Sequence, residues 1–244
     1  MADLLVIVPT RGRPGNARRV LEAWDATGAW ADAALVFAGD ADDPQIGGYR
    51  RLADERRGDH RYWWLTELPA WEPMVSKLNK VATREARNFW ALGFAGDDHL
   101  PRTPGWARSY LDALRELGTG IVFGNDLLQG ERLPTQWAMT ADIVAALGRM
   151  VPAPVEHLDS DSSIHALGRA AGCIRYLSDV VVEHVHPAAG KAPEDDQYRH
   201  WNRPTQVKKD RRAYDLWRSA QLAKDATQVR ALREVSRGRP GDDQ

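Results

Sequence analysis

The sequence has a single cysteine, no long apolar run and almost no net charge, and each of these absences excludes a class of protein. Cys173 has no partner for an internal disulfide, and its apolar neighbours predict a buried, unreactive thiol. The apolar run at residues 4–8 is too short to cross a bilayer, and no basic segment precedes it as in a secretion signal. A formal net charge of −1 argues against a surface built as a whole to bind nucleic acid or anionic lipid. We therefore expect a cytoplasmic protein that does not enter a membrane.

Several catalytic motifs are also missing. The chain has no phosphate-binding loop of the Walker type, no zinc-protease helix and no serine-centred nucleophile elbow, which disfavours those enzyme classes. It has no internal repeat. Its composition is instead that of an ordinary globular protein, 43% hydrophobic and 27% charged, and 244 residues fit one domain with a short appendage.

Segments typical of strands and helices alternate along the chain. The β-branched runs at residues 4–8 and 34–38 predict strands buried on both faces, as in a parallel sheet, with a helix at 17–24 between them. Further strands are predicted at 62–65, 93–95, 120–124 and 180–186, and further helices at 75–92, 106–117, 139–147, 163–171 and 206–236. The pattern predicts an α/β fold with a mixed, mostly parallel sheet over residues 1–204. A basic helical C-terminal arm, with a disordered end from residue 237, is predicted over 205–244.

Polar loops follow three of the predicted strands, at residues 9–13, 39–43 and 96–99. Ligands of open α/β sheets bind beyond the carboxyl ends of the strands, so these loops are expected to converge on one site. The guanidinium groups of Arg11 and Arg13 could neutralise a diphosphate, and the acidic loop with Asp40 could accept hydrogen bonds from a base or ribose. The pair Asp97 and Asp98 suits Mg²⁺ or Mn²⁺. Each loop also has a plain interpretation as a surface turn or a helix cap, and only their convergence favours a binding site.

The second half of the chain adds three candidates. His184 and His186 alternate along a predicted strand and would face the same side, as a metal or phosphate site or as two half-exposed histidines. Lys191 begins a loop rich in glycine and proline, up to residue 198, which suggests a mobile flap. Asp161 stands at the start of a short predicted helix, where it would be either an N-cap or a general base.

Together these features make the chain resemble the family-2-type glycosyltransferases with the GT-A fold, over about residues 4–200. The segment 8–14, VPTRGRP, is similar to the first strand and base-binding turn of that family, and Asp40 matches its nucleoside-binding acid. The segment 77–82, KLNKVA, resembles the helix start that precedes the metal motif. Residues 96–98 fall where the family carries Asp-x-Asp, with Gly96 in place of the first aspartate, and His184 resembles the histidine that completes the metal shell.

The resemblance implies a metal-dependent transfer of a sugar from a nucleotide-sugar donor to a hydroxyl acceptor. It implies Mn²⁺ or Mg²⁺ as cofactor, with Asp98 as the main ligand beside His184 and His186, and Asp161 as the base if the reaction inverts. The donor-binding residues are then expected to be Pro9, Thr10, Arg11, Arg13, Asp40, Lys77, Asn79, Asp97 and Lys191.

Two other functions stay open at this point. A sugar-phosphate nucleotidyltransferase would need a glycine-rich loop after the first strand, where this chain has only Gly12 and Gly15. A non-catalytic nucleotide- or nucleic-acid-binding module would bind without turnover. The acceptor is not specified. The arm interleaves basic residues (Lys208, Lys209, Arg211, Arg212, Arg218) with Tyr214 and Trp217, which suits either nucleic acid or a solvated helix face with the two aromatics packed inward. The donor, the stereochemical outcome and the oligomeric state are equally unspecified.

Overall fold

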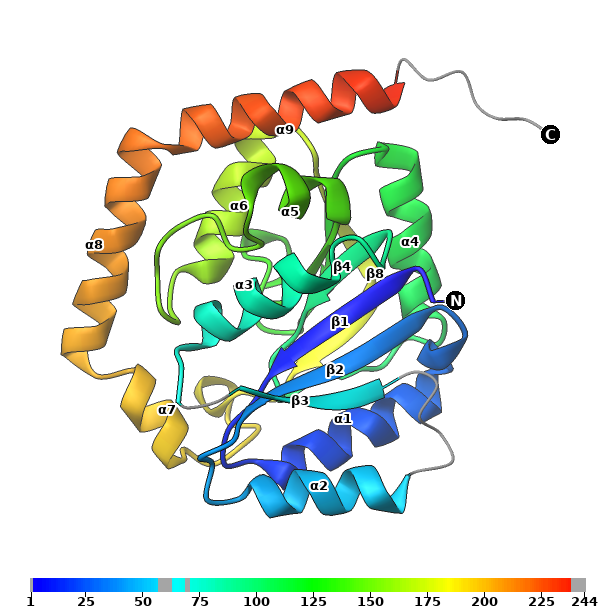
Figure 1. Ribbon diagram of the computed structural model, residues 1–244, viewed down its shortest axis with the longest axis vertical. Coiled ribbons are helices and arrows are strands. Elements are labelled where there is room, and N and C mark those ends of the chain that lie inside the picture. The colour runs from blue at the N-terminus through cyan, green and yellow to red at the C-terminus, as the bar shows by residue number, and fades with distance from the viewer. Residues whose placement is uncertain (1, 57–62, 69–70, 238–244) are drawn as a thin grey trace.

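A computed structural model describes residues 2–56, 63–68 and 71–237 (Figure 1). Its eight-stranded sheet has the order β3-β2-β1-β4-β7-β6-β8-β5. The strands are β1 (Leu4–Pro9), β2 (Ala33–Asp40), β3 (Trp63–Leu68), β4 (Ala91–Phe94), β5 (His99–Pro101), β6 (Ile121–Asn125), β7 (Trp137–Thr140) and β8 (Ile174–His184). The first four strands are parallel to one another, whereas β7 runs antiparallel to both β4 and β6. The fold is thus the predicted α/β fold with a mixed, mostly parallel sheet.

Helices cover both faces of this sheet (Figure 1). They are α1 (Pro14–Thr27), α2 (Ile46–Glu55), α3 (Met74–Glu85), α4 (Trp106–Leu117), α5 (Ala141–Leu147), α6 (Ser160–Ala171), α7 (Asp196–Trp201), α8 (Pro204–Ala220) and α9 (Leu222–Arg237). Alternate residues of β1 enter two separate cores because successive side chains point to opposite faces. Leu4, Val6 and Val8 pack with α1, α2 and α4, whereas Leu5 and Ile7 pack with α3, α5 and α6.

The C-terminal arm contributes to the second of these cores. Tyr214 and Trp217 of α8 and Ala226 and Val229 of α9 are buried in it, and the indole N–H of Trp217 donates to Asp225 at 2.9 Å. Figure 1 shows the two helices wrapped around the outside of α5 and α6. The arm therefore matches the interpretation in which its aromatic residues pack inward, so they are not available to stack on nucleic-acid bases.

Several predicted elements have different bounds in the structure. The helix predicted at 75–92 ends at Glu85, and residues 91–94 form β4 instead, because their apolar side chains lie between β1 and β7. The helix predicted from 139 begins at Ala141, and the strands β5 and β7 and the helix α2 were not predicted. The arm contains two helices rather than one. The strand predicted at 62–65 corresponds to β3, Trp63–Leu68. Residue 62 lies outside the described residues, as do residues 238–244 of the predicted disordered end.

Cys173 is buried, as predicted, and burial raises the pKa of its thiol to about 11. A thiol with this pKa carries almost no thiolate near neutral pH, which agrees with an unreactive cysteine. Among the described helices none is both long and apolar enough to cross a membrane.

Candidate active site

A cleft of about 200 Å³ opens at the carboxyl ends of β1 and β4. Of the predicted site residues, those that line it are Pro9, Thr10, Arg11, Arg13, Lys77, Asp97, Asp98, Asp161 and His184. The predicted residues that the cleft brings together are up to 175 positions apart in the chain, from Pro9 to His184. This agrees with the rule that strand ends of an open α/β sheet carry the ligand site.

The first part of the cleft is built around Asp40, which is fully buried at the end of β2. Its Oδ2 atom accepts from Arg11 at 3.0 Å and from the ammonium group of Lys77 at 2.6 Å. Burial lowers the pKa of Lys77, while the contact with Asp40 opposes this shift. The other oxygen, Oδ1, has no hydrogen-bond partner among the described residues. A buried carboxylate oxygen without a donor is unfavourable, so this position suits an incoming N–H or O–H group.

Asp97 is held by residues of the β1–α1 loop. Thr10 donates to its Oδ2 at 2.6 Å, and Arg13 donates to its Oδ1 at 3.1 Å. The same guanidinium binds Asp195 through two parallel hydrogen bonds of 2.6 Å each. Asp195 in turn caps α7 by accepting from the backbone N–H of Tyr198 at 2.8 Å. Arg13 therefore ties α7 to the cleft, in the segment where the sequence predicts a flap.

Both carboxylate oxygens of Asp97 are thus occupied by protein donors, whereas those of Asp98 face imidazoles. Asp98 Oδ2 lies 3.4 Å from His184 Nε2, and Asp98 Oδ1 lies 3.1 Å from His99 Nδ1. Strand pairing produces this arrangement, because β5 runs antiparallel to β8 with His99 opposite His184. Burial alone would raise the pKa of Asp98, but its contact with His184, the strongest opposing influence, holds it well below its usual range.

These residues fit a divalent cation. Asp98, His99 and His184 each offer one ligand atom, and the three atoms lie within 4.8 Å of one another. Neighbouring ligands around a cation at about 2.1 Å are themselves roughly 3 Å apart, close to the distance between Asp98 and His184. The missing first aspartate of the motif also has a steric reason. A Cβ atom on Gly96 would lie only 2.5 Å from Asp98 Oδ1, so a side chain there would displace the carboxylate.

Asp161 lies across the cleft, in the first turn of α6. It is not the N-cap, since that position belongs to Asp159, whose φ of 60° is unusual for a residue other than glycine. Burial raises the pKa of Asp161 to about 6. A carboxyl group with this pKa exchanges protons close to neutral pH, which is the property expected of a general base.

The loop before α6 is fixed by the C-terminal arm. The buried carboxylate of Asp210, on α8, accepts the backbone N–H groups of Glu156, His157 and Leu158 at 2.8–3.1 Å. Arg211 next to it lies 2.9 Å from Asp159. The arm therefore holds the loop that leads directly into Asp161.

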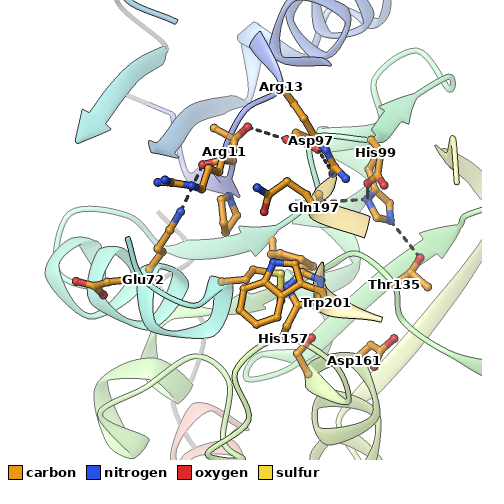
Figure 2. Close-up of a pocket in the computed structure, with 18 of the residues that line it drawn as sticks. Arg11, Arg13, Glu72, Asp97, His99, Thr135, His157, Asp161, Gln197 and Trp201 are labelled. Atoms are coloured by element: carbon orange, nitrogen blue, oxygen red, sulfur yellow. Dashed lines mark hydrogen bonds and ion pairs between the residues drawn. The ribbon is translucent and has the colours of Figure 1, made fainter. Parts of the chain in front are cut away.

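An aromatic stack forms another wall of the cleft. The indole of Trp201 lies nearly parallel both to His157, at 4.5 Å between ring centroids, and to Trp71, at 5.8 Å. Figure 2 shows Trp201 and His157 between Glu72 and Asp161, with Gln197 above them. Burial lowers the pKa of His157 to about 4, so its ring is neutral near pH 7. Trp71 is 42% exposed, so it does not belong to the hydrophobic core and presents part of its indole to solvent beside the cleft.

Four of the predicted residues do not line the cleft. Asp40 is fully buried and contacts Arg11 and Lys77, which do line it. Asn79 accepts the backbone N–H groups of Met150 and Val151, both at 2.9 Å, and so fixes the loop after α5. Lys191 forms an ion pair with Glu183 at 2.7 Å. His186 lies beyond the end of β8, where its Nδ1 accepts from Ala188, so the strand alternation assumed for His184 and His186 stops at His184.

The sequence analysis did not single out several residues that line the cleft, namely His99, Thr135, His157, Ser160, Gln197 and Trp201. His99 had a usable signal, because it directly follows the Asp-Asp pair. The others lie on loops and short helices whose position in space depends on the packing of α7 and α8.

The fold is that of the GT-A nucleotide-diphospho-sugar transferases. Three solved structures show this likeness. A mannosyltransferase from Pyrobaculum calidifontis, in complex with GDP-mannose and Mn²⁺, has a TM-score of 0.60 and 14% identity over 98% of this chain and 76% of its own. TarS (1–349) from S. aureus, in complex with UDP, has a TM-score of 0.58 and 12% identity over 97% of this chain and 91% of its own. Glucosyl-3-phosphoglycerate synthase from Mycobacterium tuberculosis, solved with Mn²⁺ and UDP, has a TM-score of 0.54 and 12% identity over 99% of this chain and 82% of its own. No family model and no curated protein matches the sequence.

Proposed function

We propose that this protein is a metal-dependent glycosyltransferase that moves a sugar from a nucleotide-sugar donor to a hydroxyl acceptor. The observation that carries the proposal is the position of Asp98 and His184, side by side in a cleft at the carboxyl end of a GT-A sheet. Structures of the same fold contain Mn²⁺ together with GDP-mannose or UDP, which supports the same ligands here. A fold by itself does not define a reaction, so the proposal depends on the side chains of the cleft.

On this proposal, the first part of the cleft binds the nucleotide. The unpartnered Oδ1 of buried Asp40 would accept an N–H or O–H of the nucleoside. Arg11 and Arg13 lie at the mouth of the β1–α1 loop, where their guanidinium groups suit phosphate oxygens. Pro9, Thr10 and Lys77 complete the lining of this part, and Asp97 holds Arg13 in place. Asn79 and Lys191 have no place in the proposed donor site, because their partners lie elsewhere.

Asp98 and His184 would hold Mn²⁺ or Mg²⁺, and the cation, when bound, would neutralise the charge of the diphosphate leaving group. Asp161 would take the proton of the acceptor hydroxyl, which gives an inverting transfer. Its pKa of about 6 leaves the carboxylate mostly ionised at pH 7 and still basic enough to accept a proton. Trp71 offers an exposed aromatic face beside the cleft, on which a sugar ring could stack.

The two rival functions predict different products. A nucleotidyltransferase would use a sugar phosphate and release pyrophosphate, and a binding module would release nothing. The loop after β1 is not the glycine-rich loop that a nucleotidyltransferase needs, because the side chains of Arg11 and Arg13 occupy it and pair with Asp40 and Asp97. A nucleic-acid acceptor loses support because Tyr214 and Trp217 are buried, and because Lys209 and Arg211 pair with Glu156 and Asp159.

A thermal-shift screen of UDP-, GDP-, dTDP- and CMP-sugars, each with and without Mn²⁺, tests the proposal. We expect one nucleotide class to raise the melting temperature only when the metal is present. The selected donor is then incubated with the enzyme, and the release of nucleoside diphosphate is measured. Stabilisation without metal and without turnover would support the binding module, and release of pyrophosphate would support the nucleotidyltransferase.

A further inference from the structure

His99 is held in one orientation by both of its ring nitrogens. Its Nε2 lies 3.3 Å from the hydroxyl oxygen of Thr135, and that hydroxyl donates its hydrogen to Asp126 at 2.8 Å. Since a threonine hydroxyl has a single hydrogen, the Thr135 oxygen must accept from His99. The proton of the imidazole is therefore on Nε2, and Nδ1 carries a lone pair. Histidines that bind metals are commonly oriented in this way, through a hydrogen bond from the second nitrogen.

The Nδ1 lone pair faces the carboxylate of Asp98. The distance from Nδ1 to Asp98 Oδ1 is 3.1 Å, and neither atom has a hydrogen to share in this tautomer. Two acceptors at this distance repel each other unless a positive charge lies beside them. The backbone N–H of Gly96, at 3.0 Å, is the donor that now meets Nδ1. A divalent cation would be a stronger partner for the same lone pair.

Gly96 lies directly beside both Asp98 and His99. A Cβ at this position would lie 2.5 Å from Asp98 Oδ1 and 2.8 Å from His99 Nδ1. The space that a side chain at position 96 would need is thus taken by the carboxylate and the imidazole together.

His184 can join the same cation. Its Nε2 lies 3.4 Å from Asp98 Oδ2, and its ring stacks on His99 with the centroids 4.0 Å apart. The lone pair of an imidazole nitrogen lies in the plane of its ring, so two stacked rings cannot both direct a lone pair at one ion. One of the two side chains must therefore rotate when the ion binds. The Nδ1 atom of His184 has no partner among the described residues, whereas both nitrogens of His99 are held. His184 is therefore the ring that turns.

We propose that His99 is a third protein ligand of the cation, oriented by Thr135 and Asp126, and that the site consequently prefers Mn²⁺ to Mg²⁺. This inference rests on the proposed function, since it concerns the same metal. One carboxylate and two imidazoles form a nitrogen-rich set that suits Mn²⁺, while Mg²⁺ favours oxygen ligands. Thr135 and Asp126 are positioning residues and do not touch the ion.

The test is metal binding by the full-length protein, measured without turnover. Electron spin echo spectroscopy of Mn²⁺-loaded wild type counts the coupled imidazole nitrogens, and calorimetry gives the affinity for Mn²⁺ and for Mg²⁺. We expect two coupled nitrogens in the wild type and one in His99→Gln. We also expect His99→Gln to weaken Mn²⁺ binding by about 10- to 100-fold and Thr135→Val by about 10-fold, with Mg²⁺ binding changed less. His165→Gln is the matched control, since His165 lies on α6 against Phe123 and does not line the cleft, and it should leave both affinities unchanged.

The wild-type spectrum decides the matter even if a variant fails to fold. A single coupled nitrogen in the wild type, or Mn²⁺ binding that is unchanged in folded His99→Gln, would overturn the role of His99 and leave the proposed function intact. If the wild type binds no Mn²⁺ with or without UDP or GDP, the metal itself is wrong, and the proposed function fails together with this inference.

Discussion

The two parts of the cleft differ in how their carboxylates are balanced. On the side of β1 and β2, basic side chains neutralise the acids, with Lys77 on Asp40 and Arg13 on Asp97. On the side of β5, β8 and α6, the described residues include no lysine or arginine that forms an ion pair with Asp98 or Asp161. The first part is thus a finished binding surface. In the second part, the carboxylates of Asp98 and Asp161 have no basic partner of this kind, so they are free to bind a cation and to accept a proton, as proposed above.

The largest effect is expected at Asp98. Asp98→Ala removes the carboxylate that the proposed metal needs, and several kcal/mol of charge stabilisation correspond to a loss of about 10³-fold in kcat/KM. The measurement is release of nucleoside diphosphate over a range of Mn²⁺ concentrations, with circular dichroism as the control for folding. Full metal-dependent turnover in this variant would end the assignment as an enzyme of this kind.

Asp161 provides the next largest change and a pH signature. Asp161→Asn should lower kcat by about 10²-fold while the donor still binds, because only the proton acceptor is lost. A base must be ionised, and the pKa of Asp161 is raised to about 6. The wild-type rate should therefore fall as the pH drops through 6 and level off above 7. A flat profile between pH 5 and 7 would argue against Asp161 as the base.

Stability tests the same difference between the two parts. Lys77→Met leaves the buried charge of Asp40 without its closest cation and is expected to lower the free energy of unfolding by about 3 kcal/mol. Asp98→Asn, measured at pH 8 without metal, should lower it by a smaller amount, because the folded protein holds the pKa of Asp98 below its usual range and so stabilises the ionised carboxylate. Urea unfolding of both variants beside the wild type checks this. A loss in Asp98→Asn as large as that in Lys77→Met would show that the charge of Asp98 is balanced as fully as that of Asp40.

The smallest effect is expected where α7 meets the cleft. Asp195→Asn breaks a partly exposed pair with Arg13 and should weaken nucleoside diphosphate binding by less than about 10-fold. The neighbouring Asp196→Asn is the matched control, since Asp196 pairs only with Arg199 of its own helix among the described residues. Calorimetric titration compares the two. Equal behaviour of both variants would mean that the Arg13–Asp195 pair does not contribute to donor binding.

The sequence predicted the first part of the cleft better than the second. Strands such as β1 and β2 are continuous apolar runs, so their ends, and the loops with Arg11 and Asp40, could be located from local pattern alone. The strands β5 and β7 have three and four residues, too few to show a period, and they exist because of their pairing with β8 and β4. The proximity of His99 and His184 follows from that pairing, so it could not be predicted from the sequence.

Contacts across long stretches of chain were equally hidden. Arg13 and Asp195 are 182 positions apart, and nothing in either segment points to the other. The overlong helix at 75–92 has a similar cause, since residues 91 and 92 continue the helical spacing in sequence but pair with β1 in the sheet. Asn79 was chosen by its place in a motif and Lys191 by its place in a predicted flap, and the structure gives each a partner outside the cleft.

Asp210 has a practical consequence for anyone who shortens this protein. A boundary at residue 204 looks natural from the sequence, and removing the arm would seem to spare the catalytic half. It would instead delete the carboxylate that fixes three successive amide groups just ahead of Asp161. Truncation at residue 204 is therefore expected to disturb the loop that leads into Asp161, so α8 has to be kept together with the rest of the chain.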